Sequence, residues 1–125
     1  MEVKVAAIVL TALFATSAQA EVVLRCAVTE KHICQMGVGC ASAAPTEIHA
    51  WGNFYPASRA YERCDPKGCD RYEAAVSQSG VFTNVEIPGK AAFIKIGPDG
   101  VFNEVATSGL TDYISFGRCA IPPTG

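Results

Sequence analysis

The fold of this chain is decided by residues 70–119, which read DRYEAAVSQSGVFTNVEIPGKAAFIKIGPDGVFNEVATSGLTDYISFGRC. Apolar and polar residues alternate along five short segments: 70–77, 81–87, 91–96, 101–107 and 113–118. The strongest turn signal between them is Gly97-Pro98-Asp99-Gly100, because proline presets φ for a type I turn and glycine takes the left-handed position that follows. A period of two with such short connections predicts consecutive antiparallel strands, since a parallel crossover needs a longer connection.

Each segment has one apolar and one polar face, so the sheet is expected to bury one side and expose the other. A meander of this kind twists and curls over its apolar face into a small barrel or half-barrel. Further strands are predicted at 22–28, 47–52 and 60–64, while residues 31–45 are rich in Cys, Gly, Ala and Ser and show no period. The sequence therefore predicts an all-β domain with a disulfide-stapled N-terminal loop region.

The first twenty residues have the pattern of an export signal. Lys4 gives the N-terminus a positive charge, and an apolar run extends from Val5 to Ala15. Ala18-Gln19-Ala20 has the small-x-small pattern of a signal-peptide cleavage site. The apolar run is shorter than the roughly 20 residues that cross a bilayer. We expect a signal peptide at 1–20, a single disulfide-bonded domain at 21–120 and a flexible tail at 121–125. The mature protein is then periplasmic or secreted, with no membrane attachment after cleavage.

All six cysteines lie after residue 20. An even number in a short exported chain predicts a framework of three disulfides. Six cysteines allow about fifteen pairings, and spacing alone does not select one. Geometry favours Cys64–Cys69 across a short hairpin loop and Cys26–Cys119 between the chain ends, which leaves Cys34–Cys40 as a second local bridge. The alternative is a metal or redox site with His32 and His49 as possible helpers, but neither Cys34-x5-Cys40 nor Cys64-x4-Cys69 has the tightest zinc spacing, and no Cys-x-x-Cys motif is present.

Charge and motifs exclude several classes of function. The chain has ten Lys and Arg and twelve Asp and Glu, and one of each group lies in the first twenty residues. No block of positive charge is present, which disfavours nucleic acid and anionic membranes as partners. The histidines are His32 and His49, and no Gly-x-Ser-x-Gly or His-Glu-x-x-His motif occurs. We therefore predict no catalytic residue, no metal and no cofactor.

The aromatic residues either line a concave binding face or fill the core. Six aromatic residues are candidates for either role: Trp51, Phe54, Tyr55, Tyr61, Tyr72 and Tyr113. The predicted strand 47–52 places His49 on the same face as Trp51, and the candidate binding surface comprises His49, Trp51, Tyr55 and Tyr61.

The leading hypothesis is a non-enzymatic domain that binds a protein or a small molecule in the periplasm. One alternative is an inhibitor of a secreted or periplasmic hydrolase such as lysozyme, by analogy with small exported half-barrel lysozyme inhibitors. Another is a small hydrolase that uses His49 with a nearby carboxylate.

Three motifs carry a resemblance over nearly the whole mature chain. They read RCDPKGCDRYEA at 63–74, SGVFTN at 79–84 and SFGRC at 115–119. They are similar to motifs of a group of small, exported, cysteine-rich proteins of Gram-negative bacteria. The resemblance implies a periplasmic location and supplies no catalytic residues.

Overall fold

The computed structural model describes residues 21–122, so the predicted signal peptide and the last three residues of the predicted tail lie outside the described residues. Within this range the chain forms ten antiparallel strands and one short 3-10 helix, η1. The bounds are β1 Leu24–Gln35, β2 Gly39–Ser42, η1 Pro45–Glu47, β3 Trp51–Tyr55, β4 Ala60–Asp65, β5 Gly68–Glu73, β6 Ala75–Ser79, β7 Phe82–Ile87, β8 Ala92–Ile96, β9 Val101–Ser108 and β10 Thr111–Ala120. The meander predicted from residue 81 onward is confirmed, whereas the predicted strand at 70–77 is wrong, because the chain bends at Ala74 and divides it between β5 and β6.

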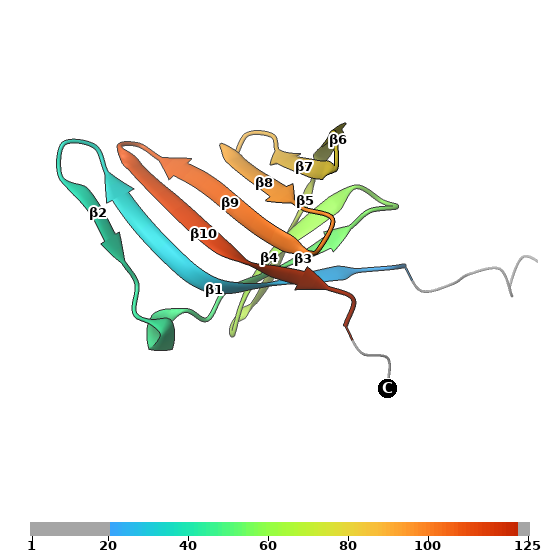
Figure 1. Cartoon of the computed structure of the whole chain (residues 1–125), viewed down its shortest axis with the longest axis horizontal. Helices are drawn as coiled ribbons and strands as arrows, with labels where there is room; N and C mark the ends of the chain where they lie inside the picture. The colour runs from blue at the N-terminus through green and yellow to red at the C-terminus, as the bar shows by residue number, and fades with distance from the viewer. Residues whose placement is uncertain (1–20, 123–125) are drawn as a thin grey trace, which may run out of the picture.

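The strands form a nearly closed antiparallel barrel (Figure 1). Their order is β5-β4-β3-β1-β10-β9-β8-β7-β6, so the first and last strands of the chain pair with each other. The two edge strands, β5 and β6, are consecutive in sequence and separated only by Ala74. The Ala74 N–H donates to the carbonyl of Arg59 over 2.9 Å. One bent segment thus supplies both edges, which leaves the barrel open only along that segment.

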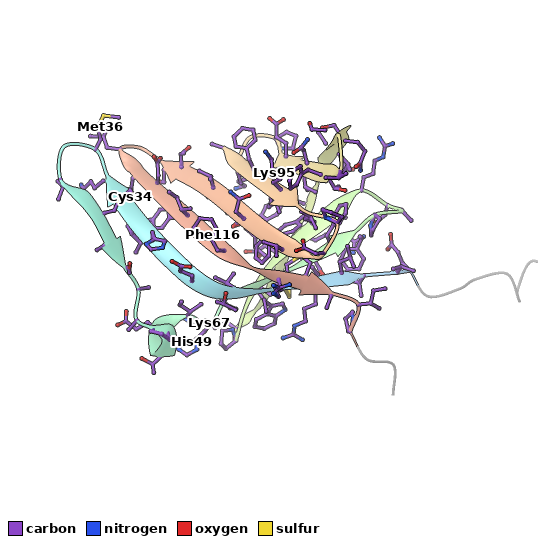
Figure 2. All side chains as sticks on the ribbon, viewed as in Figure 1. Cys34, Met36, His49, Lys67, Lys95 and Phe116 are labelled. Carbon is purple, nitrogen blue, oxygen red and sulfur yellow. A yellow bond between two sulfur atoms is a disulfide. The ribbon has the colours of Figure 1, made fainter. Side chains whose placement is uncertain are left out.

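Strand β1 is long enough to take two different neighbours on one side. Its first residues pair with β3 and its last four pair with β2, while β10 runs beside it on the other side. The ends of β1, β2, β9 and β10 extend beyond the rest of the barrel as an arm, and Figure 2 shows Met36 at its end.

The expected loop at residues 31–45 is therefore wrong, because β1 and β2 form a hairpin there. All four residues of β2 are exposed. A strand that buries neither face needs no apolar alternation, and so it leaves no period in the sequence.

The predicted strand at residues 47–52 is also misplaced. Pro45 begins η1, Ile48 to Ala50 have no regular structure, and the strand starts only at Trp51. Proline is favoured at the first position of a helix, since its fixed φ suits the helical turn and its missing N–H is not needed there. His49 therefore does not lie on a strand.

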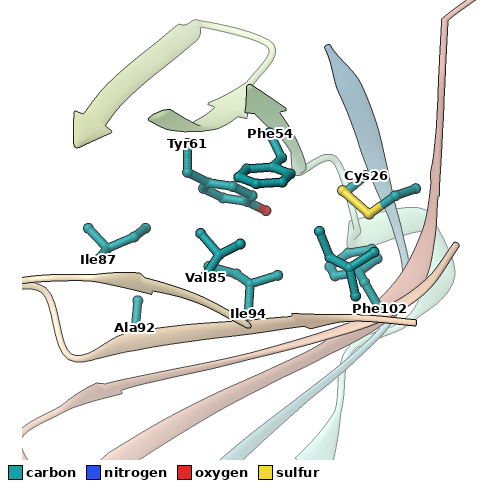
Figure 3. Packing of buried hydrophobic residues seen from close by; sticks show 10 residues of the cluster. Cys26, Phe54, Tyr61, Val85, Ile87, Ala92, Ile94 and Phe102 are labelled. Atoms are coloured by element: carbon teal, nitrogen blue, oxygen red, sulfur yellow. A yellow bond between two sulfur atoms is a disulfide. The ribbon is translucent and has the colours of Figure 1, made fainter. Parts of the chain in front are cut away.

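The core lies between the β3–β4 layer and the β7–β8 layer (Figure 3). Phe54 and Tyr61 from the first layer face Val85, Ile87 and Ile94 from the second. Phe102 and the Cys26–Cys119 disulfide lie at one end of this cluster. The alternation of the meander strands thus places their apolar residues inside, as a one-sided sheet requires.

Each of the three disulfides joins two residues that are paired across neighbouring strands. They are Cys26–Cys119 between β1 and β10, Cys34–Cys40 between β1 and β2, and Cys64–Cys69 between β4 and β5. The favoured pairing is confirmed. Among residues 21–122 no helix has the length and apolar character needed to cross a bilayer.

Candidate functional site

A cavity of about 240 Å³ lies between β3 and β4 on one side and β1, β9 and β10 on the other, and it is partly open, since Ala50 and Tyr113 in its wall are exposed. Its wall combines aromatic rings with charged side chains, among them Lys31, Tyr61, Arg63, Glu104 and Tyr113. Ligand pockets for drug-sized molecules usually measure about 300–1,000 Å³. The space therefore suits a compact molecule of roughly one ring.

An ion pair crosses the barrel interior at this cavity. The Arg63 guanidinium on β4 donates to the Glu104 carboxylate on β9 over 3.2 Å. Glu104 is well buried, with 16 % of its side chain exposed, and Arg63 is about one-third exposed. Because the two residues are 41 positions apart in sequence, the pair ties the N-terminal strands to the meander.

Lys31 brings a second positive charge to the cavity wall. It lies opposite Ser115 in the β1–β10 ladder, and its Nζ sits 5.6 Å from the centre of the Tyr113 ring. The ion pairs among residues 21–122 are His32–Glu30, Arg63–Glu104 and Arg71–Glu21. None of them involves Lys31. The cavity wall therefore contains two cationic side chains, Lys31 and Arg63, and one carboxylate, Glu104.

Tyr61 supplies a neutral hydroxyl to the same wall. Burial raises the pKa of Tyr61 well above its ordinary value of 10, and the nearby Glu104 carboxylate raises it further while Arg63 lowers it. The side chain is only 2 % exposed. Its hydroxyl lies where a Cβ on Gly52 would stand, so the ring fits only because residue 52 is a glycine. Ser115, also buried, adds a second hydroxyl to the cavity.

The four residues of the predicted binding surface do not share one surface. Trp51 borders the cavity, but it precedes the inward-facing Gly52 on β3, so its ring lies on the outer face, with the Arg25 guanidinium 4.7 Å from the ring centre. Tyr61 is buried inside the barrel. His49 is exposed beside η1, as Figure 2 shows, and is not part of the cavity wall. His49 is separated from Trp51 because the strand starts only at residue 51, and Tyr61 is separated from the others because it faces the barrel interior.

Tyr55 lies outside the barrel, at the end of β3. Its hydroxyl donates to the Glu62 carboxylate over 2.5 Å, and the Arg71 guanidinium lies 4.4 Å from the centre of its ring. The hydrogen bond to Glu62, together with burial and the Glu62 charge, raises the pKa of Tyr55. This contact ties together the outer faces of β3, β4 and β5.

The aromatic residues are divided between the two roles considered for them. Tyr113 lines the cavity, Tyr61 belongs to both the cavity wall and the core, Phe54 belongs to the core and Tyr72 packs against it. The charged residues of the cavity were missed. One signal was available for Glu104, which interrupts the apolar face that Phe102 and Ala106 form along β9.

A larger hollow of about 580 Å³ lies over β6 to β9. Its wall includes exposed outer-face residues such as Phe93, Lys95 and Glu86. These strands are consecutive in one sheet, so the hollow lacks the opposing layer that faces the interior cavity. The interior cavity is therefore the better candidate for enclosing a ligand.

A second exposed feature is the end of the arm, where two hairpin tips meet. Met36 and Val38 in the β1–β2 turn are 74 % and 77 % exposed, and Leu110 in the β9–β10 turn is 62 % exposed. The Met36 N–H donates to the Leu110 carbonyl over 2.9 Å, and the Cys34–Cys40 disulfide crosses the hairpin just behind. The tips thus form one fixed apolar end.

Glu62, Cys64 and Cys69 are the group of metal-ligating residue types that lie close together in the described part of the chain. The two sulfur atoms are joined in a disulfide. Cysteine binds a metal as a thiolate and not as a disulfide, which leaves the Glu62 carboxylate as the single ligand, so this group does not form a metal centre.

Fold and cavity together define a small, disulfide-bonded, up-and-down β-barrel with an interior cavity of mixed aromatic and charged lining. Comparison with protein-family models, with curated proteins and with solved structures finds no match for this chain.

Proposed function

We propose that this protein is an exported, non-enzymatic binding domain that holds a compact small molecule in its interior cavity. The observation that carries the proposal is the cavity wall, where aromatic rings and three charged side chains from both halves of the chain converge. Barrel interiors are recurrent ligand sites, and a few placed polar groups in a largely apolar wall are typical of such sites.

The three disulfides support an oxidising location, either extracellular or periplasmic. Intact mass of the protein recovered from fractionated cells tests this directly. We expect the periplasmic or culture fraction to contain a chain beginning at Glu21, with alkylation of thiols only after reduction.

Trp51 makes the binding proposal measurable, because it is the single tryptophan of the chain and borders the cavity. Benzamide, benzoate and benzamidinium are compact one-ring probes of matched shape. We expect at least one of them to change the Trp51 fluorescence saturably, with a Kd of about 1 mM or tighter, near −4 kcal/mol. Calorimetry should give the same constant.

The matched variant is Ala50→Phe, at an exposed position on the cavity wall. We expect it to block the cavity and abolish the response while leaving the unfolding transition unchanged. If none of the three probes produces a saturable signal with the wild-type protein, the binding proposal is refuted.

The hydrolase hypothesis places its reactive group outside this cavity, since His49 is not part of the wall. If the protein has an esterase or amidase activity that depends on this residue, His49→Ala should abolish it. Retention of probe binding in His49→Ala, with no hydrolytic activity in the wild type, favours the binding domain.

A second candidate function, inhibition of an exported hydrolase, is favoured by the fixed apolar end of the arm. A disulfide and a cross-turn hydrogen bond hold Met36, Val38 and Leu110 in place before any partner arrives. Such preorganisation lowers the entropic cost of inserting a hairpin into a cleft, and exposed apolar patches mark interaction sites.

Lysozyme activity against bacterial cell walls tests this candidate. We expect stoichiometric protein to slow the enzyme and Val38→Asp to remove the effect. Val81→Asp is the control, because Val81 is similarly exposed at the distant β6–β7 turn. An undiminished lysozyme rate in excess wild-type protein contradicts this candidate.

A further inference from the structure

A one-residue irregularity in β1 determines the charge of the cavity. The β1–β10 register shifts between Val28 and Glu30, which leaves Thr29 without a partner on β10. This is a β-bulge, and it inserts one extra residue into one strand of the pair. The Thr29 hydroxyl donates to the carbonyl of Phe116 over 3.4 Å.

The bulge reverses which side chains face inward. Cys26 and Val28 lie on the inner face of β1, so uninterrupted alternation would place Glu30 inside next and Lys31 outside. With the extra residue, Lys31 faces the cavity instead, and Glu30 pairs outside with His32 over 2.6 Å. A slip of one residue exchanges the faces of a strand, and here it exchanges a carboxylate for an ammonium in the cavity wall.

Without the bulge, the charged side chains of the wall would be Arg63 and the two carboxylates Glu30 and Glu104. With the bulge, they are the cations Lys31 and Arg63 and the single carboxylate Glu104. Because Arg63 forms an ion pair with Glu104, Lys31 is the cationic side chain of the wall that is available to bind a ligand. The rings of Tyr61 and Tyr113 offer an apolar surface on the same wall.

From this arrangement we infer that the cavity selects a small organic anion, a carboxylate with a compact apolar body, and that Lys31 binds its charged end. This inference rests on the proposed binding function and names the ligand class of the same site. The neutral hydroxyls of Tyr61 and Ser115 are available to donate to the same carboxylate. Hydrogen bonds between ionised partners are about twice as strong as neutral ones, so charge decides between ligands of equal shape.

The test compares benzoate, benzamide and benzamidinium, which share one shape and differ in charge. We expect wild-type protein to bind benzoate at least tenfold more tightly than benzamidinium, with benzamide between them. Lys31→Met should weaken benzoate binding about tenfold, the loss expected for one charge-assisted hydrogen bond, and leave benzamide unchanged.

Lys90→Met is the matched control. The Lys90 Nζ also lies 5.6 Å from the centre of a tyrosine ring, that of Tyr72, but Lys90 is not part of the cavity wall. Its replacement should leave all three affinities unchanged. A general effect of losing a lysine or a cation–π contact would appear equally in both variants.

The bulge itself is tested by deleting Thr29, which should bring Glu30 inward and reverse the preference toward benzamidinium. Lys31→Glu introduces the same charge without changing the register, and it keeps the test valid if the deletion does not fold. Equal binding of benzoate and benzamide by the wild type overturns the inference but leaves the binding function standing. Unchanged benzoate affinity in Lys31→Met also overturns it. Binding of none of the three probes removes the proposed function itself.

Discussion

The two halves of the barrel are stabilised in different ways. No disulfide joins two strands of the meander from β6 to β10. This meander contributes most of the buried apolar residues: Val85, Ile87, Ala92, Ile94, Ile96, Phe102 and Cys119. Strands β1 to β5 bury fewer side chains and contain both short-range disulfides, Cys34–Cys40 and Cys64–Cys69. Strand pairs with many buried apolar side chains are stabilised by packing without a disulfide. Strand pairs with few buried side chains are stabilised by a disulfide.

Only the third disulfide crosses between the halves, and its loss should have the largest effect. Cys26 and Cys119 are separated by 93 residues, so their bond restricts the unfolded chain far more than the short-range ones. We expect Cys26→Ala with Cys119→Ala to lower the free energy of unfolding by about 4–5 kcal/mol, against about 2 kcal/mol for Cys34→Ala with Cys40→Ala.

Urea unfolding of both double variants measures this difference. The short-range pair, separated by 6 residues, is the control for losing two sulfur atoms and one bond. Equal destabilisation of the two variants would show that loop length is not what distinguishes the halves.

A second prediction concerns the packing of the meander. Ile94 is buried on β8, so Ile94→Ala leaves a cavity and should cost about 2–5 kcal/mol. Val38→Ala, in the exposed tip of the disulfide-linked half, should change the free energy of unfolding by less than about 0.5 kcal/mol. Thermal and urea unfolding of the two variants should agree. A small effect at Ile94 would contradict the view that packing alone holds the meander.

The smallest predicted effect concerns pH, at the contact between the two halves. Burial raises the pKa of Tyr61 in the folded state. Below about pH 10 Tyr61 is protonated in both the folded and the unfolded chain, so its contribution to the free energy of unfolding does not change with pH. Above that pH the unfolded chain ionises first, and stability falls by about 1.4 kcal/mol per pH unit from this residue.

Tyr61→Phe removes that dependence, because phenylalanine does not ionise in either state. Unfolding midpoints in urea, compared at about pH 9 and about pH 11, should fall less for Tyr61→Phe than for the wild type. Tyr72→Phe is the control, since Tyr72 is only partly buried. An identical fall in Tyr61→Phe and wild type would mean that Tyr61 is not buried when the chain folds.

The meander was predictable because its strands bury one face, so that apolar alternation and glycine turns mark each strand. The hairpin of β1 and β2 was not, since β2 buries neither face. The disulfide pairing followed from the hairpin geometry of Cys64 and Cys69 and from the join of the first and last strands. Of the candidate site, Trp51 and Tyr61 were singled out as aromatic residues, although the surface proposed for them was wrong.

The sequence alone determined an antiparallel β meander from residue 81 onward and an even set of cysteines, because alternation, turn residues and cysteine number are local or countable properties. Only the tertiary structure decided that β1 pairs with β10, that Arg63 meets Glu104 across the interior, and that a bulge at Thr29 turns Lys31 inward. The direction of a side chain on a strand depends on the register with a partner about ninety residues away. That register is set by packing between distant segments, which no local pattern in the sequence records.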